Sequence, residues 1–163
     1  MSGETAYADW IAVDWGTSHL RAWAMSCDGS VRAEAGSDDG MGRLDRAVFE
    51  PALLRVIDPW LGAARMPVVA CGMVGSRQGW VEAPYATTPC RPLPEALITA
   101  PVTDPRIEVR VVPGVRQMDP PDVMRGEETQ IAGYLATHPG FDGILCLPGT
   151  HTKWVHVSAG EIV

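Results

Sequence analysis

Short apolar runs separated by turn residues open the chain and predict three antiparallel strands. The run Trp10–Val13 ends at an acidic residue, Asp14, and its length and composition indicate a buried strand. A second strand is predicted over Leu20–Met25. The dipeptide Asp28-Gly29 is a strong hairpin signal and leads into a third strand over residues 31–35. The chain is therefore expected to begin with an antiparallel meander.

The pattern then changes to helical spacing and to fully apolar strands. Apolar residues recur at helical intervals over 44–61, but Pro51 and Pro59 interrupt them, so we expect a break or two short helices. The continuous apolar run 67–73 predicts a buried strand, because both of its faces are apolar. The alternating segment 107–112 predicts a further strand.

Loops and one more helix follow in the second half of the chain. Residues 74–93 are rich in Gly, Pro, Ser and Thr, and loops of this length inside a compact domain are often functional. Residues 113–122 are predicted to form a second loop. A helix is predicted over 127–138 and strands over 144–147 and 153–157. Strands and helices that alternate in this way predict an α/β fold.

Two distant segments resemble each other. Ile11–Thr17 and Ile144–Thr150 are both apolar runs that end in Gly-Thr. Each is followed by a basic residue and a second apolar strand, Arg21-Ala22-Trp23 in the first copy and Lys153-Trp154-Val155 in the second. Few residues are identical, so chance similarity stays an alternative. A true repeat would mean two copies of one strand–turn–strand unit.

Composition and charge restrict the function classes. The chain is 46% hydrophobic and 20% charged, as expected of a folded soluble domain rather than a disordered one. A net charge of -7 disfavours nucleic acid as a partner. No pair among the four cysteines has C-x-x-C spacing, which favours free thiols in a reducing compartment. The sequence has neither a signal-peptide pattern nor a membrane-length apolar run, so we expect a cytoplasmic protein without membrane contact.

The first Gly-Thr turn has the residues of a phosphate site. Asp14 ends a buried strand, and Gly16 lets the following backbone approach a ligand closely. Amide groups of the turn, with the hydroxyls of Thr17 and Ser18, can surround phosphate oxygens. Asp14 can hold a Mg²⁺ ion that bridges the phosphates. The alternative is an ordinary hairpin in which the acid accepts from turn amides.

The second Gly-Thr turn offers the same chemistry without the acid. Gly149 and Thr150 can hold phosphate oxygens from the opposite side, and Lys153 can neutralise the charge of the transferred group. The alternative for Lys153 is a solvated side chain at a strand edge.

Two acids stand at the start of the predicted helix over 127–138. Acids complement the helix dipole at this end, which is a sufficient structural explanation for both. The functional interpretation is that one carboxylate accepts the proton of a sugar hydroxyl. Glu127 is favoured, because Glu128 lies about 100° further round the helix and is expected to point elsewhere.

The loop over residues 75–82 carries the side chains needed to bind a polyol with a carboxylate. Arg77 can make a two-point contact with carboxylate oxygens, Trp80 can cover a sugar face, and Glu82 can accept from hydroxyls. The alternative is a surface loop anchored by a buried tryptophan. The candidate substrate-binding residues are Ser76, Arg77, Gln78, Trp80 and Glu82.

Four stretches, in this order and spacing, resemble the 2-dehydro-3-deoxygalactonokinase family. They are Asp14–Trp23, Gly72–Tyr85, Val123–Gly133 and Leu147–Val155, and together they extend over nearly the whole chain. The resemblance implies membership of the sugar kinase, hexokinase and actin fold group. It also implies transfer of the γ-phosphoryl group of ATP to the 6-hydroxyl of 2-dehydro-3-deoxy-D-galactonate, with Mg²⁺, in galactonate catabolism.

The resemblance also assigns residues. Asp14, Gly16 and Thr17 match the first phosphate motif of the fold group, and Gly149-Thr150 matches the second. Gly126-Glu127 lies where related sugar kinases have Gly-Asp at the proposed base. Lys153 joins Glu127 and Asp14 as a catalytic candidate. The cofactor-binding candidates are Gly16, Thr17, Ser18, Arg21, Gly149 and Thr150.

The expected architecture is a ribonuclease-H-like domain over 1–121 and the start of a second, incomplete copy over 122–163. Members of the family are longer, and the adenosine pocket is expected in the additional part, so this chain is expected to be an inactive fragment. Two alternatives stay open: a non-catalytic piece that binds the sugar acid, and another ATPase of the same fold group. Whether the protein forms a homo-oligomer is also open.

Overall fold

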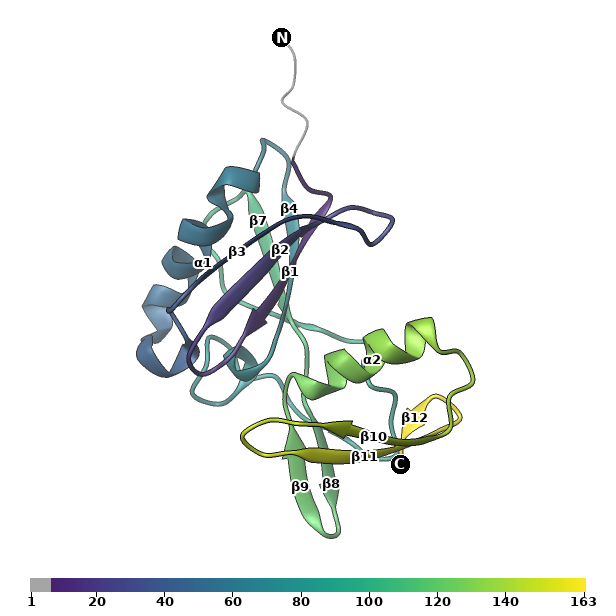
Figure 1. Ribbon diagram of the computed structural model, residues 1–163. Helices are drawn as coiled ribbons and strands as arrows, with labels where there is room; N and C mark the ends of the chain where they lie inside the picture. Colours follow the sequence, from purple (N-terminus) through teal and green to yellow (C-terminus); the bar gives the residue numbers. More distant parts are fainter. Residues whose placement is uncertain (1–6) are drawn as a thin grey trace.

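A computed structural model describes residues 7–163 and has two layered parts (Figure 1). One part is a six-stranded sheet with α1 (Phe49–Ile57) against one face. The other contains α2 (Glu127–Thr137) and two three-stranded sheets. The protein is thus a mixed α/β structure, as the sequence predicted. Among residues 7–163, no helix is both long and apolar enough to cross a membrane.

The large sheet has the strand order β3-β2-β1-β4-β7-β6. Strands β1, β2 and β3 form the predicted antiparallel meander, β4 and β7 continue the sheet in parallel with β1, and β6 is antiparallel at the edge. The bounds are β1 Trp10–Trp15, β2 Leu20–Met25, β3 Val31–Ser37, β4 Met66–Cys71, β6 Ile98–Thr99 and β7 Ile107–Val111.

Strand β1 shows how this sheet places its side chains. Ile11, Val13 and Trp15 are buried and belong to the same core cluster as the residues of α1. Because side chains alternate along a strand, Asp14 lies on the opposite face, which α1 does not cover. The acid therefore ends a buried strand while its carboxylate stays partly accessible.

The helical region differs from the prediction at one proline. Pro51 does not break the helix, because it lies in the first turn of α1, where a proline costs no intrahelical hydrogen bond. Pro59 does end the regular helix, and the chain continues as a 3-10 turn over Asp58–Trp60. Two further 3-10 turns, Met41–Arg43 and Arg46–Val48, precede α1.

The long segment after β4 is mostly irregular, as predicted, with a 3-10 turn at Met73–Gly75 and the short strand β5 at Ala86–Thr87. The prediction of a loop over 113–122 was wrong. This segment contains β8 (Val115–Met118) and the start of β9 (Pro121–Met124), which pair as a hairpin. Pro121 is tolerated as the first residue of its strand, and β8 gains β5 as a parallel second partner.

The remaining strands form a separate small sheet in the order β10-β11-β12. Their bounds are β10 Gly143–Leu147, β11 Lys153–Ser158 and β12 Glu161–Ile162. Val155 and Val157 of this sheet pack with Ile131 of α2 and with Val115 of β8 in a second core cluster. This cluster places α2 between the small sheet and the face of the large sheet that carries Asp14 (Figure 1).

Candidate functional site

Asp14 is held at the end of β1 by an ion pair with Arg21. The two residues are directly opposite in the β1–β2 register, so the pair crosses between neighbouring strands. Asp14 is also the register partner of Cys71 at the end of the parallel strand β4. Both side chains of the ion pair keep solvent access, at 64% for Arg21 and 31% for Asp14.

The Gly16–Ser18 turn is rigid although it lies on the surface. Gly16 N donates to His19 O at 3.0 Å, which closes the turn. Met41 N donates to Gly16 O at 2.9 Å and Gly42 N donates to Thr17 O at 3.0 Å, so a distant segment supports it from outside. Thr17 and Ser18 are exposed at the tip. The turn therefore presents hydroxyls to solvent on a fixed backbone.

Gly72, directly after β4, allows the end of β1 and the start of α2 to approach the end of β4 closely. Its φ of +94° lies in the region that favours glycine, and a Cβ here would stand 2.9 Å from Trp15 O and 3.3 Å from Asp14 Oδ1. A Cβ on Gly126, the residue before α2, would stand 3.4 Å from the Cα of Gly72. The end of β1, the end of β4 and the start of α2 thus meet at one point.

The two acids at the start of α2 have different environments. Glu127 is half-buried, and its Oε2 accepts from Arg125 N at 2.9 Å. Glu128 is 0% exposed, and both of its carboxylate oxygens accept from Gly126 N, at 2.9 and 2.7 Å. Burial raises the pKa of Glu128 from 4.5 to about 7.

A cavity of about 380 Å³ lies between the large sheet and α2. Asp14 and Cys71 line it from the sheet, and Gly126, Thr129 and Gln130 line it from the helix. Burial, followed by the charges of Asp14 and Glu128, raises the pKa of the Cys71 thiol to about 12, so this cysteine stays protonated. Most of the remaining lining is apolar, from Trp10, Ala12, Val13, Trp23, Val69, Leu93 and Val112.

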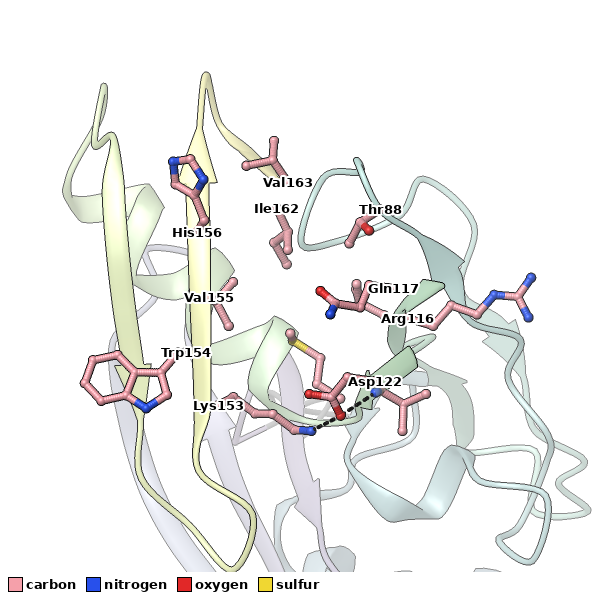
Figure 2. Close-up of a pocket in the computed structure, with 13 residues that line it drawn as sticks. Thr88, Arg116, Gln117, Asp122, Lys153, Trp154, Val155, His156, Ile162 and Val163 are labelled. Carbon is pink, nitrogen blue, oxygen red and sulfur yellow. Dashed lines mark hydrogen bonds and ion pairs between the residues drawn. The ribbon is translucent and has the colours of Figure 1, made fainter. Parts of the chain in front are cut away.

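The second Gly-Thr turn joins β10 to β11. Gly149 and Thr150 are exposed, and in Figure 1 this turn lies on the same left-hand side of the view as the β1–β2 turn. Lys153 does not extend toward the tip as a free cation. Figure 2 shows its ammonium group paired with Asp122 of β9, and its side chain is only 12% exposed. This ion pair lowers the pKa of Asp122 and lies beside a small cavity of about 50 Å³.

Only part of the loop over residues 75–82 is exposed. Arg77, Gln78 and Glu82 are exposed, as a substrate-binding role requires. The prediction that Trp80 covers a sugar face was wrong. Its indole is 4% exposed and stacks on Phe49 in the core, with ring centroids 6.0 Å apart. Packing of the indole against the apolar residues of α1 is more favourable than its exposure on a polar loop surface.

Sequence reasoning missed two features of the site. It directed Glu128 away from the site, whereas the structure buries this residue beside Cys71 and Gly126. The available signal was its position three residues before the buried Ile131, which places both on one helical face. It also left out Arg125, whose guanidinium group lies 4.3 Å from the Tyr85 ring centroid.

Known proteins resemble this chain over nearly all of its length. The probable 2-dehydro-3-deoxygalactonokinase DgoK1 of Rhizobium meliloti (strain 1021) is 40% identical over 155 residues, which cover 94% of this chain and 51% of the relative. The 2-dehydro-3-deoxygalactonokinase of Escherichia coli (strain K12) is 36% identical over 157 residues, covering 95% of this chain and 51% of the relative. The chain therefore spans about half the length of the curated relatives it matches.

A solved structure and a family model agree with these relatives. A crystal structure from Sinorhizobium meliloti, provisionally described as a 2-dehydro-3-deoxygalactonokinase protein, matches with a TM-score of 0.83 and 38% identity. The match covers 94% of this chain and 51% of that chain. The model of the family described as 2-keto-3-deoxy-galactonokinase matches residues 14–163. With the site geometry above, this match shows that the chain belongs to the 2-keto-3-deoxy-galactonokinase family.

Proposed function

We propose that this chain carries the sugar-acid and phosphate half of a kinase that transfers the γ-phosphoryl group of ATP to the 6-hydroxyl of 2-dehydro-3-deoxy-D-galactonate. The main support is the meeting of Asp14, Gly72 and the first turn of α2 at one point beside a cavity. The names of the relatives support the substrate class. In-line transfer needs a metal-binding acid and a proton acceptor close together, and Asp14 and Glu127, in the first turn of α2, are the candidates for these roles.

Asp14 is the proposed ligand of a magnesium–nucleotide complex. Among residues 7–163, no group of three or more His, Cys, Asp or Glu residues is arranged to enclose a metal. Mg²⁺ in kinases is commonly held by one or two carboxylates, with water and phosphate as its other ligands, so Asp14 alone is sufficient. When bound, the ion neutralises the charge on the transferred group. Gly16, Thr17 and Ser18, with Gly149 and Thr150, are the proposed phosphate contacts.

Two basic residues belong to the same proposal in different ways. Arg21 pairs with Asp14 and fixes its carboxylate until a ligand arrives. Lys153 is the proposed second cation, but its ammonium group must first leave Asp122. Movement of β11 relative to the β8–β9 hairpin would release it. Lys153 is therefore not a preformed phosphate contact.

Glu127 is the proposed acceptor of the hydroxyl proton. Its half-buried carboxylate keeps access to a ligand, and Arg125 N holds it in place. Glu128 is the alternative, because a pKa of about 7 suits proton transfer near neutral pH. Access favours Glu127, since Glu128 is 0% exposed and both of its oxygens already accept a hydrogen bond.

Polar side chains of the loop over 75–82 are the proposed contacts with the sugar acid. Arg77 grips the carboxylate, and Gln78 and Glu82 bond the hydroxyls. Ser76 Oγ is buried without a hydrogen-bond partner among the described residues, so a ligand hydroxyl would satisfy it only after the loop moves. Trp80 anchors this loop in the core and has no substrate contact in the proposal.

The sheet topology supports a finer fold assignment. Three antiparallel strands followed by two parallel strands, with a helix after the third strand, is the order expected of a ribonuclease-H-like domain. We propose that residues 7–121 form such a domain; the first six residues of the predicted range 1–121 lie outside the described residues. The antiparallel strands β10, β11 and β12 repeat the opening of that order, so residues 122–163 are proposed to begin a second copy.

One experiment separates the candidate functions. The purified chain is incubated with ATP, Mg²⁺ and either 2-dehydro-3-deoxy-D-galactonate or its gluconate-derived epimer, and phosphorylated product is measured by mass spectrometry. Calorimetric titration with each ligand runs in parallel. Product formed with the galactonate derivative supports the proposed reaction and overturns the expectation that this chain is an inactive fragment. Binding of the sugar acid without product supports a non-catalytic binding role. A rate of ATP hydrolysis that neither sugar acid changes supports another ATPase of the fold group.

A further inference from the structure

Arg125 connects the two polar parts of the candidate site. Its Nη2 donates to Ala83 O at 2.8 Å, and its guanidinium carbon lies 4.3 Å from the centroid of the Tyr85 ring. Its backbone N donates to Glu127 Oε2 at 2.9 Å. The side chain of Arg125 therefore holds Ala83 and Tyr85, which directly follow the loop over residues 75–82, here called the sugar-acid loop. Its main chain holds the carboxylate of Glu127, the proposed proton acceptor.

The guanidinium group is packed tightly on its other side as well. A Cβ on Gly75 would stand 3.0 Å from Arg125 Nη1 and 2.8 Å from Val111 Cγ1. Ala83 N donates back to Gly75 O at 2.9 Å, which closes the loop around the guanidinium group. The loop and the residue before α2 are thus locked together by close contacts, and a shift of one must shift the other.

Stability alone does not explain a guanidinium group at this position. Nε and Nη1 of Arg125 are buried without a hydrogen-bond partner among residues 7–163, and Arg125 forms no salt bridge within that range. Buried donors without partners cost free energy, so a neutral apolar side chain would be more favourable if only packing mattered. Groups that break this rule in folded proteins are concentrated at functional sites.

We propose that Arg125 is a positioning residue that sets the separation between the sugar-acid loop and the carboxylate of Glu127. The inference rests on the proposed function, because it assigns the loop to the substrate and Glu127 to the hydroxyl proton. Phosphoryl transfer depends on the placement of the hydroxyl, and small misplacements reduce the rate strongly. Arg125 acts through the residues that it holds and does not itself touch the substrate.

The test compares Arg125→Lys with a matched Arg65→Lys control. Arg65 also donates from its guanidinium group to a backbone carbonyl, Ile107 O at 3.3 Å, but it precedes β4, at the opposite end of that strand from Cys71. Lysine keeps the charge and loses the planar stacking on Tyr85. Arg125→Lys is expected to lower kcat/KM for the sugar acid by about 10- to 100-fold, with KM for ATP unchanged within about twofold. A value equal to that of Arg65→Lys overturns the proposal.

Amide hydrogen exchange tests the same coupling between the loop and α2, and it does not require catalytic turnover. The amides of Ala83 and of Thr129, which donates to Gly126 O at 3.2 Å, report the loop and the first turn of α2. Both are expected to exchange about tenfold faster in Arg125→Lys and in Tyr85→Leu than in Arg65→Lys. Faster exchange at Ala83 alone, or at neither amide, contradicts a connection between loop and helix.

The two readouts separate failure of the inference from failure of the proposed function. If the parent chain neither binds nor phosphorylates the sugar acid but both amides respond, the connection stands and the proposed function fails. If the parent chain binds or phosphorylates the sugar acid and Arg125→Lys matches Arg65→Lys in both readouts, the proposed function stands and the positioning role fails.

Discussion

Two hairpins with similar sequences have different surroundings. The β1–β2 turn lies at the centre of a six-stranded sheet, with hydrogen bonds from Met41 and Gly42 to its carbonyls. The β10–β11 turn belongs to a three-stranded sheet in which β10 is an edge strand. On the outer face of that sheet, Ile144 is 57% and Trp154 is 73% exposed. The same strand–turn–strand pattern thus has one strand face buried in the core of a six-stranded sheet in one place, and an exposed outer face in a three-stranded sheet in the other.

The difference teaches that the neighbouring segments decide which charged groups lie beside a Gly-Thr turn. The first turn has a carboxylate beside it, because Asp14 lies two residues before Gly16, and Gly72 allows β4 to end close to that carboxylate. The second has a cation nearby, but Asp122 already neutralises it. Four measurements test this contrast, beginning with the largest expected effect.

Matched tryptophans test the packing of the two hairpins. Trp15 is 0% exposed and packs against Phe49 and Trp80, whereas Trp154 is 73% exposed. Trp15→Ala is expected to lower the free energy of unfolding by about 3–5 kcal/mol, because it empties a core position. Trp154→Ala is expected to change it by less than about 0.5 kcal/mol. Urea unfolding followed by far-ultraviolet circular dichroism measures both, and equal losses would contradict the contrast.

Matched acids test the chemistry of the two hairpins. Asp14→Ala is expected to lower turnover by about 10²- to 10³-fold without unfolding the chain, because it removes the proposed metal ligand. Asp142→Ala, next to β10, removes an exposed carboxylate that only accepts from Ser158 and is expected to leave turnover unchanged. Where the parent chain shows no turnover, calorimetric titration with Mg²⁺ and ATP is the measurement. Near-normal function of Asp14→Ala removes this residue from the mechanism.

Titration of Glu128 tests the environment beside the first hairpin. Its folded pKa of about 7 is raised above 4.5, so the folded state binds the proton more tightly and stability falls as pH rises between these values. The loss is expected to reach about 3 kcal/mol. Glu128→Gln should remove this slope from the urea midpoint, whereas Glu127→Gln should keep it. A slope that survives Glu128→Gln assigns the titration to another group.

The ion pair beside the second hairpin should titrate with the opposite sign. The hydrogen bond from Lys153 lowers the pKa of Asp122, so its contribution is present above the unfolded pKa and is lost as pH falls. The side chain of Asp122 is largely exposed, which makes the effect small. The same pH series therefore distinguishes a buried acid near the first hairpin from an exposed one near the second.

Matched glycines test the backbone packing beside the two turns. Gly72→Ala places a Cβ 2.9 Å from Trp15 O at a φ of +94°, and is expected to cost about 1–3 kcal/mol of unfolding free energy. Gly149→Ala meets no atom within 4 Å and is expected to stay within about 0.5 kcal/mol of the parent chain. Thermal unfolding compares the two directly. An equal shift in Tm would show that close packing at Gly72 is not what distinguishes the first turn.

Local patterns predicted much of the fold but not all of its pairings. The meander, the strand at β4 and the helix α2 follow from runs of residues that are adjacent in sequence. The β8–β9 hairpin was missed, because Pro113, Pro120 and Pro121 gave this segment the composition of a loop. Its strand β8 also pairs with β5, which lies 29 residues away in the register Ala86↔Val115. A strand that is stabilised by a distant partner leaves little signal in its own residues.

The amino-acid sequence by itself determined which residues are candidates for the site and which local strand, turn or helix carries each of them. It put Asp14 at a strand end, Gly16 and Thr17 in a turn, and Glu127 at a helix start, because hydrophobic alternation and turn residues act over short distances. Only the tertiary structure decided which of these groups meet, and how buried they are. Trp80 turned into the core, Lys153 paired with Asp122, and Glu128 lost its solvent, because each outcome depends on contacts between segments far apart in the chain.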